Sequence, residues 1–377
     1  DVLNPATEEV VAKIGAGTAE DVSRAVMSAR EAFNSFSQTF KQERVELLTE
    51  VRNLYKKRFN DIAEAIREEM GAPGHLAFGA QTAVGLGHLK TAIRVLEQFE
   101  FEQQREKFLI RYEPIGVCGL ITPWNWPINQ IVSKIAPAIA SGCTILLKPS
   151  ELSPISAHVI AEVIDEAGVP AGVFNLVDGF GPIVGEAMSA HPDIDMMSFT
   201  GSTRGGVAVA KGSAETVKRV SQELGGKSAN IVLNDAALEK SVRDGVLACM
   251  ENTGQSCNAP TRMLVPKERH QEAIEIAKEA SESITVGNPE DDQTQLGPVI
   301  SDVQFNKVQH LIQSGIDEGA MLVTGGMGRP DGLSKGYFVK PTVFAEVTSD
   351  MSIFREEIFG PVLSISTYDD ADEAVTI

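Results

Sequence analysis

The sequence predicts an α/β fold, in which a parallel, doubly wound sheet is followed by a second α/β domain. Short apolar runs indicate buried strands at residues 115–121, 144–147, 174–177 and 196–199. Helix-like stretches lie between them, such as residues 155–167, which Gly168 and Pro170 close. Strands that alternate with helices indicate a parallel sheet. A length of 377 residues indicates two domains.

The N-terminal third of the sequence predicts helices that precede this sheet. Residues 4–17 indicate a short extended hairpin, and residues 20–36 place apolar side chains at helical spacing. Residues 42–59 and 61–70 repeat the helical pattern. The polar stretch 101–112 predicts a second hairpin, before the first strand of the sheet.

Composition narrows the class of protein. Asp and Glu number 52 against 33 Lys and Arg, a net charge of -19, which argues against a nucleic-acid partner. No apolar run approaches the roughly 20 residues of a membrane span, and the start at Asp1 does not indicate a signal peptide. Neither end of the sequence has the form of a natural terminus, because it starts without methionine and stops at Ile377, inside a predicted helix.

The four cysteines contain no CxxC pair, and the six histidines form no spaced cluster, so neither a zinc site nor a disulfide framework is expected. Cys257 lies in the polar segment 251–262, after the helix-like run 236–250 and before the strand-like run 262–266. Most cysteines are small buried hydrophobes. A reactive thiolate, however, needs such a loop. A thiol nucleophile also favours a reducing compartment, and we expect the cytoplasm.

Three further segments support a reactive Cys257. Residues 222–230 read Gln-Glu-Leu-Gly-Gly-Lys-Ser-Ala-Asn and precede a run at residues 231–233 that predicts a strand. Residues 123–127 read Pro-Trp-Asn-Trp-Pro. Residues 356–361 read Glu-Glu-Ile-Phe-Gly-Pro. In this order, and together with Asn-Pro-Ala-Thr at residues 4–7, the sequence resembles the aldehyde dehydrogenase superfamily over almost its whole length.

The resemblance implies three catalytic residues. Cys257 would attack the aldehyde, Asn125 and the backbone N–H of Cys257 would form the oxyanion hole, and Glu223 would activate water to hydrolyse a thioester. The product would be a carboxylic acid, and no metal is required. Two alternatives stay open. One is a coenzyme A-acylating dehydrogenase, although that branch commonly lacks the glutamate, and the other is a catalytically silent NAD-binding scaffold.

Two glycine-bearing turns, residues 179–185 and 199–206, follow predicted strands, where backbone N–H groups can approach a pyrophosphate. Gly201 and Ser202 are assigned to the phosphates, and Gly181 and Gly206 to close packing of the backbone in this region. The other residues assigned to the cofactor are Lys148, Glu151, Gly181, Gly225, Glu357, Phe359 and Trp124.

Lys148 and Glu151 could hold the adenosine ribose, because a carboxylate accepts from its hydroxyls. The carboxylate would repel a 2′-phosphate, so NAD is predicted over NADP. A plain surface ion pair is the alternative. By resemblance, Glu357 would bind the nicotinamide ribose and Phe359 would pack near its ring.

The resemblance also implies the domain organisation. Residues 1–96 and 115–226 would form a variant Rossmann dinucleotide-binding domain. Residues 97–114 would form a projecting β-hairpin arm used in oligomerisation, as in a homodimer or homotetramer, although an ordinary exposed hairpin is the alternative. Residues 227–377 would form a catalytic domain that is incomplete at its C-terminal end, because family members normally continue well beyond this point.

The substrate is a small aldehyde of unknown identity. Trp126 is a candidate for the wall of the substrate channel. The other residues near the expected site are polar, namely Asn129, Gln130, Ser133, Glu251, Ser256 and Asn258. We therefore hypothesise that the preferred aldehyde carries a polar group at its far end.

Overall fold

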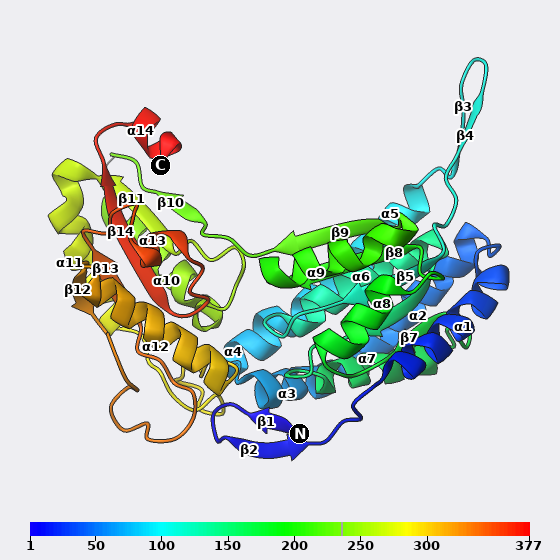
Figure 1. The fold of residues 1–377 in the computed structure, drawn as a ribbon, viewed down its shortest axis with the longest axis horizontal. Coiled ribbons are helices and arrows are strands. Elements are labelled where there is room, and N and C mark those ends of the chain that lie inside the picture. Colours follow the sequence, from blue (N-terminus) through cyan, green and yellow to red (C-terminus); the bar gives the residue numbers. More distant parts are fainter. Residues whose placement is uncertain (235–236) are drawn as a thin grey trace. The chain divides into compact units, whose positions relative to one another are not determined.

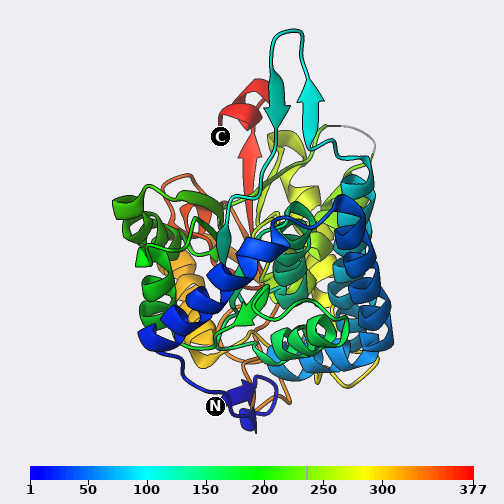
Figure 2. The same ribbon diagram turned by 90° about the vertical axis from the view of Figure 1, so that its right-hand side faces the viewer.

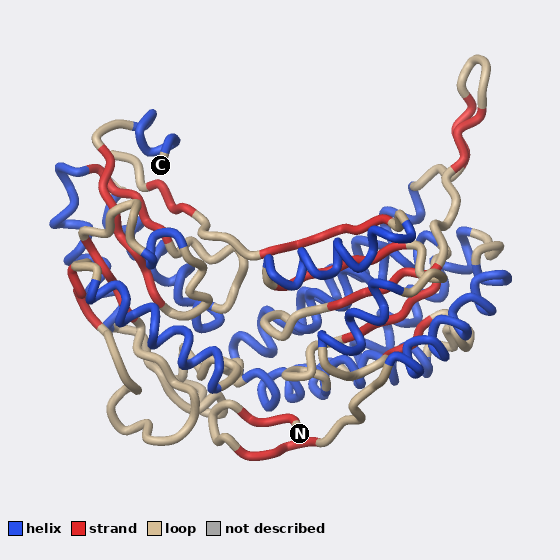
Figure 3. Tube along the Cα trace, in the orientation of Figure 1, coloured by secondary structure: helices blue, strands red, loops and turns tan. Residues whose placement is uncertain are grey.

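The structure is a computed structural model that describes residues 1–234 and 237–377. It consists of two compact units (Figures 1 and 3). Unit 1 contains residues 1–2, 10–69 and 77–224, and unit 2 contains residues 3–9, 70–76 and 225–377. At the N-terminus, β1 (Val2–Asn4) and β2 (Glu9–Ala12) form a two-stranded sheet. The predicted hairpin is thus present, but its strands begin at residue 2 and end at residue 12 instead of spanning residues 4–17.

The core of unit 1 is a five-stranded parallel sheet. Its order is β7 (Phe174–Leu176), β6 (Thr144–Lys148), β5 (Val117–Ile121), β8 (Met196–Gly201) and β9 (Arg219–Leu224). Every residue of β5 and β6 is buried, which explains why their sequences are mostly apolar, with Lys148 at the end of β6 as the charged exception. The chain runs outward from β5 first to one side and then to the other, so β5 is the switch point near whose carboxyl end such sheets bind ligands.

Helices cover this sheet. Apolar side chains of α1 (Ala19–Phe36), α8 (Glu186–Ala190) and α9 (Thr203–Ser213) share one core cluster with β5, β6 and β8. α6 (Pro127–Ser141) and α7 (Ile155–Glu166) contact β6 and β7 and are backed by α2 and α5. The remaining elements of this part of the chain are α2 (Lys41–Lys57), α3 (Phe59–Met70), α5 (Thr82–Gln98), η1 (Ala77–Gln81), η2 (Gly181–Gly185) and η3 (Ala214–Thr216).

A hairpin projects from unit 1. Its strands β3 (Glu102–Gln104) and β4 (Leu109–Arg111) pair antiparallel, with Glu102 opposite Arg111. Figures 1 and 2 both show it standing away from the helices and sheet of that unit. The hairpin predicted over residues 101–112 is confirmed.

Unit 2 is built on a second five-stranded sheet, in the order β10 (Ala229–Ile231), β11 (Arg262–Pro266), β14 (Val362–Tyr368), β13 (Thr342–Ala345) and β12 (Met321–Thr324). β12 is antiparallel to its neighbour and the other pairs are parallel. The helices are α4 (Gly74–Leu76), α10 (Leu238–Met250), α11 (His270–Glu282), α12 (Asp302–Asp317), α13 (Ser352–Arg355) and α14 (Ala371–Thr376). Short helical turns lie at η4 (Glu251–Gly254) and η5 (Lys267–Arg269).

Residues 231–250 match the sequence predictions only in part. The helix predicted over residues 236–250 is present as α10, but Ala236 lies outside the described residues. The strand predicted over residues 231–233 is wrong, because the strand is Ala229–Ile231 and Leu233 follows it with 56% of its surface exposed. In the part of the chain that the structure describes, every helix is too short or too polar to cross a lipid bilayer.

Candidate active site

Cys257 follows an unusual turn in unit 2. α10 ends at Met250, and then Asn252 (φ 55°), Thr253 (φ 57°) and Gly254 (φ 69°) adopt consecutive left-handed conformations. This conformation is costly for a β-branched residue such as Thr253. Position 254 requires glycine both because of its left-handed backbone and because a Cβ there would lie 2.0 Å from the Gly360 carbonyl oxygen. Such strain persists only where the surroundings impose it.

Buried amides impose this conformation. The Gln255 side chain is fully buried, and its Nε2 donates to the Asn252 carbonyl at 3.1 Å, while its Oε1 accepts from the Ile300 N–H at 3.0 Å. Asn252 Nδ2 donates in return to the Gln255 carbonyl at 3.1 Å. Thr253 Oγ1 donates to the Gly297 carbonyl, also at 3.1 Å. The residues before Cys257 are therefore held by segments more than 40 positions away.

Cys257 is the exposed cysteine, whereas Cys118, Cys143 and Cys249 are buried. Burial raises the pKa of the Cys249 thiol to about 12, so that thiol stays protonated. The pKa of Cys143 falls to about 6, chiefly because Cys118 donates to its sulfur, but only 3% of Cys143 is accessible. Cys257 is the cysteine that a substrate of ordinary size can reach.

A second group in unit 2 gathers around Glu357, in the segment between α13 and β14. Its carboxylate accepts from the Gly226 N–H at 3.2 Å, and a Cβ on Gly225 would lie 2.0 Å from that carboxylate. Lys307 Nζ donates to the Glu357 carbonyl at 2.8 Å. Burial raises the pKa of Glu357, against the Gly226 hydrogen bond and the charge of Lys307. The structure thus brings the predicted cofactor residues Gly225 and Glu357 together.

Phe359 lies beside Glu357 in the same segment. It has a left-handed backbone, with φ 58°. Gln304 on α12 donates through Nε2 to the carbonyls of Ile358 at 3.1 Å and Phe359 at 2.7 Å. The segment 356–361 is therefore fixed from α12.

Unit 1 carries Asn125 between β5 and α6. Asn125 is 3% exposed, and its carbonyl accepts from Gln81 Nε2 at 3.4 Å. Pro127 opens α6, where its fixed φ suits a first helical position. Trp124 and Trp126 are half-buried on either side of Asn125. This amide sits at the switch point of the sheet, after the carboxyl end of β5.

Other predicted cofactor residues lie at carboxyl ends of the same sheet. Lys148 ends β6 and is 3% exposed, and its Nζ donates to the Pro149 carbonyl at 2.8 Å and pairs with Glu151 Oε2 at 3.2 Å. Gly201 ends β8, and Ser202 caps α9 by accepting from the Gly205 N–H at 3.2 Å. Because the strands are parallel, these turns share one edge.

Similarity to known proteins agrees with this arrangement. The profile of the Aldehyde dehydrogenase family matches residues 1–377. A 3-succinoylsemialdehyde-pyridine dehydrogenase of a Pseudomonas species is 53% identical over 378 residues, covering 100% of this chain and 79% of the relative.

This chain belongs to the aldehyde dehydrogenase family.

Solved aldehyde dehydrogenases have the same fold. A variant of aldehyde dehydrogenase C from Pseudomonas syringae, solved with NAD+ and octanal, matches with a TM-score of 0.99 at 51% identity, over 100% of this chain and 77% of that one. An aldehyde dehydrogenase from Bartonella henselae matches with a TM-score of 0.97 at 48% identity, over 100% of this chain and 79% of that one. The α/β class with parallel sheets, predicted from the sequence, is confirmed.

In this aldehyde dehydrogenase, Glu223 lies near the carboxyl end of β9 with an exposed side chain. The sequence reasoning missed Lys134 on α6, whose Nζ donates to Ser198 Oγ at 2.8 Å. Burial lowers the pKa of Lys134 to about 8, while the charge of Glu223 opposes this fall. The sequence could have pointed to this residue, because Lys134 is the one charged residue in the otherwise uncharged sequence of α6.

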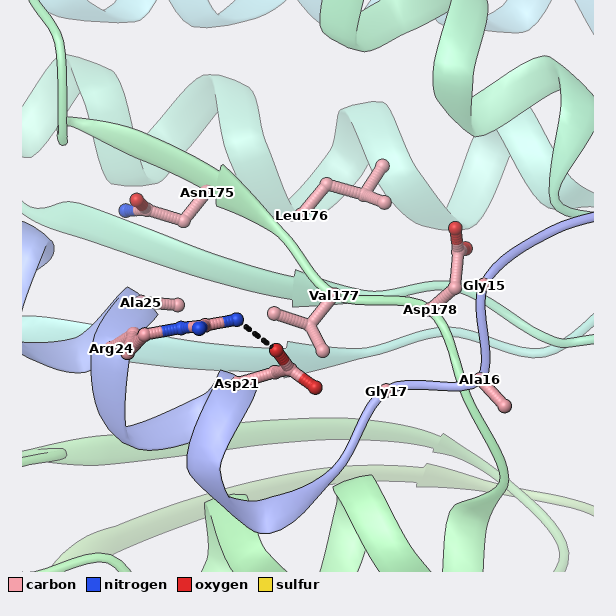
Figure 4. A pocket seen from close by; sticks show the side chains of 10 residues that line it. All are labelled: Gly15, Ala16, Gly17, Asp21, Arg24, Ala25, Asn175, Leu176, Val177 and Asp178. Carbon is pink, nitrogen blue, oxygen red and sulfur yellow. Dashed lines mark hydrogen bonds and ion pairs between the residues drawn. The ribbon is translucent and has the colours of Figure 1, made fainter.

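A separate pocket of about 420 Å³ lies by the carboxyl end of β7 (Figure 4). An ion pair between Asp21 and Arg24 stands on one side of it. None of the predicted site residues lines it. Within residues 1–234 and 237–377, no three His, Cys, Asp or Glu side chains gather in a way that could hold a metal ion.

Proposed function

We propose that this aldehyde dehydrogenase oxidises an aldehyde to a carboxylic acid with NAD, through a thioester on Cys257. The observation that carries the proposal is the exposed Cys257 thiol behind the strained turn 252–254, which buried amides hold in place. A strained backbone next to a nucleophile is typical of a catalytic site. The NAD+ and octanal bound to the Pseudomonas syringae relative support the same chemistry.

The reaction begins when the Cys257 thiolate adds to the aldehyde carbon and forms a C–S bond. The Asn125 amide and the Cys257 backbone N–H donate to the oxyanion, and each such donor is typically worth about 3 to 4 kcal/mol. Bound NAD supplies the hydride acceptor. Departure of the hydride leaves a thioester on Cys257.

Hydrolysis needs a base. Glu223 takes a proton from water as the water oxygen attacks the thioester carbon. The C–S bond then breaks, the acid leaves, and Cys257 returns as a thiolate.

The residues present fit a dinucleotide. We assign Lys148 and Glu151 to the adenosine ribose, since their ion pair at the end of β6 leaves a carboxylate oxygen for a hydroxyl. The first turn of α9 would receive the pyrophosphate through Gly201 and Ser202. Five further residues complete the assignment, namely Glu357 for the nicotinamide ribose and Phe359, Trp124, Gly181 and Gly225 near the cofactor. On this assignment Lys148, Glu151, Gly201 and Ser202 belong to unit 1, whereas Glu357, Phe359 and the nucleophile Cys257 belong to unit 2.

Cofactor preference provides a test of Glu151. The Glu151 carboxylate would repel the 2′-phosphate of NADP. Glu151→Gln is therefore expected to lower the ratio of kcat/KM with NAD to kcat/KM with NADP about tenfold, equivalent to about 1.4 kcal/mol. The measurement is steady-state NADH and NADPH formation. Glu166→Gln, which changes an exposed glutamate at the end of α7, serves as the control. Equal ratios in wild type and Glu151→Gln would contradict the assignment.

The substrate that we propose is an aldehyde with a polar group at its far end. Asn129 lies in the first turn of α6, four residues after Asn125, and its Oδ1 hydrogen-bonds with His88 Nε2 of α5 at 2.7 Å. Ser133 follows one turn later, half-buried, and Gln130 is also half-buried. The name of the Pseudomonas relative, which acts on a succinoyl semialdehyde of pyridine, fits this polarity.

Removal of this polarity should change selectivity. For Asn129→Leu we expect kcat/KM for a keto- or carboxyl-terminated aldehyde to fall about tenfold relative to octanal, because a half-buried polar partner is lost. Parallel assays with both aldehydes give the ratio. The matched control is Val132→Leu, which changes a buried apolar position of the same helix. Wild-type preference for octanal, unchanged in Asn129→Leu, would disprove the polar substrate.

Two alternatives to hydrolytic aldehyde oxidation predict different assay results. A coenzyme A-acylating enzyme would turn over faster when coenzyme A is added, and a silent scaffold would bind NAD without forming NADH. The presence of Glu223 favours hydrolysis. NADH formation over an aldehyde panel, with and without coenzyme A, therefore tests the proposed function directly.

We also propose that the chain assembles as a homodimer or homotetramer in the cytoplasm. The projecting hairpin supports assembly, because Phe108 and Leu109 are 60% and 52% exposed on it. A reducing compartment would keep Cys257 as a thiol.

A further inference from the structure

Glu69 is a carboxylate that the proposed chemistry does not use. It lies near the C-terminal end of α3 and is 0% exposed. Its two oxygens accept three hydrogen bonds from the start of α7, namely from Ile155 N–H at 2.5 Å, Ser156 N–H at 3.1 Å and Ser156 Oγ at 2.5 Å. A buried carboxylate is costly unless it is hydrogen-bonded in this way.

These contacts replace a missing cap. The N-cap residue of α7 is Pro154, which makes no side-chain cap hydrogen bond. The free N–H groups of a first helical turn need acceptors, and a negative charge there is favoured by the helix dipole. Glu69 supplies both the acceptor oxygens and the negative charge, although it lies on α3, 86 positions before Ile155. The position of the α7 N-terminus therefore depends on this side chain.

The start of α7 controls the turn that we assign to the ribose. Glu151 lies only four residues before Ile155. Ser150 tightens the intervening turn, since its Oγ accepts from the Leu152 N–H at 3.2 Å. A shift of the first turn of α7 would thus move Glu151, and with it the carboxylate that pairs with Lys148.

The same end of α7 reaches the second cofactor turn. His158, in the first turn of α7, pairs through Nε2 with Asp178 Oδ2 at 2.7 Å. Asp178 immediately precedes Gly179 and the turn that leads to η2. Figure 4 shows its carboxylate directed away from the Asp21–Arg24 pair. One helix end thus links Glu69 to both turns.

We propose that Glu69 is a positioning residue for the cofactor, whose carboxylate fixes the N-terminus of α7 and thereby places Glu151 and Lys148 against the adenosine ribose. The inference rests on the proposed function. It goes beyond that function because Glu69 would contribute to cofactor affinity without contacting the cofactor. Glutamine keeps the size of Glu69 but removes its charge and one acceptor, so it tests this role with little change in packing.

The experiment compares Glu69→Gln with Glu68→Gln, its exposed neighbour. Affinities for NAD, ADP and nicotinamide mononucleotide are measured by calorimetry, and kcat is measured at saturating NAD. For Glu69→Gln we expect NAD and ADP to bind about tenfold more weakly, because both contain the adenosine ribose. Nicotinamide mononucleotide affinity and kcat should stay within twofold, and Glu68→Gln should match wild type throughout.

Ser156→Ala removes one donor to Glu69 and gives a milder variant if Glu69→Gln folds poorly. We expect it to weaken ADP binding about threefold, again without a change in kcat. Unchanged ADP affinity in Glu69→Gln and Ser156→Ala would overturn the inference. Equal losses for ADP, nicotinamide mononucleotide and kcat would also overturn it, since they would indicate a general structural defect.

Glu151→Gln separates this inference from the proposed function. ADP affinity that falls in Glu151→Gln but not in Glu69→Gln would overturn the positioning role alone. ADP affinity unchanged in Glu151→Gln would instead overturn the ribose assignment, and the positioning role with it.

Discussion

Serine at position 257 is expected to lower kcat for aldehyde oxidation by about 10⁴-fold or more, as is typical when a nucleophile is removed. A serine hydroxyl is not ionised near neutral pH and is a weak nucleophile, whereas a thiol ionises far more readily and its thiolate is a strong nucleophile. The NAD dissociation constant should stay unchanged, because Cys257 forms bonds with the substrate and not with the cofactor. Steady-state NADH formation and an NAD titration give the two numbers.

Cys249→Ala is the matched control for this variant. Cys249 lies eight positions earlier, fully buried in the core of unit 2, with its Sγ 3.8 Å from the Val362 carbonyl. Its loss should leave a small cavity and lower stability by about 1 kcal/mol, while kcat per folded molecule stays within twofold. Turnover that survives in Cys257→Ser but disappears in Cys249→Ala would refute our choice of nucleophile.

The strands of unit 1 could be predicted from the sequence because of where they lie. β5 and β6 are central and buried on both faces, so all their residues except Lys148, which ends β6, are apolar or small. β10 is an edge strand with exposed and half-buried residues in alternation. There the apolar run at residues 231–233 extends past the strand, and the prediction was displaced by two residues.

Residue types at the candidate site could also be predicted, but not the geometry that holds them. Asn often adopts a left-handed conformation, but nothing local in Thr253 indicates one. The turn is held by Gln255, which hydrogen-bonds to Ile300, 45 positions away. Glu69 was missed for the same reason, since its partner Ser156 is 87 positions away. Periodicity and short motifs report neighbours in sequence, whereas these contacts are decided by the packed fold.

Glutamine in place of Glu223 is expected to separate the two halves of the reaction. Hydride departure needs Cys257 and the oxyanion donors, so the first turnover should still release NADH. Hydrolysis needs a base, and its loss typically slows a step by about 10²- to 10⁴-fold. We therefore expect a burst of one NADH per active site, followed by a steady state lowered by that factor. Rapid-mixing absorbance at the NADH band measures both phases.

The burst is what makes Glu223→Gln decisive, because a merely structural role would lower both phases together. Mass spectrometry of the stalled enzyme should find the acyl group on the peptide that contains Cys257. Glu215→Gln, an exposed glutamate of the same unit, should show wild-type rates in both phases. If Glu223→Gln keeps full turnover, and coenzyme A accelerates the wild-type enzyme, then a thiol and not water accepts the acyl group. Glu223 would in that case have no part in the acyl-transfer step.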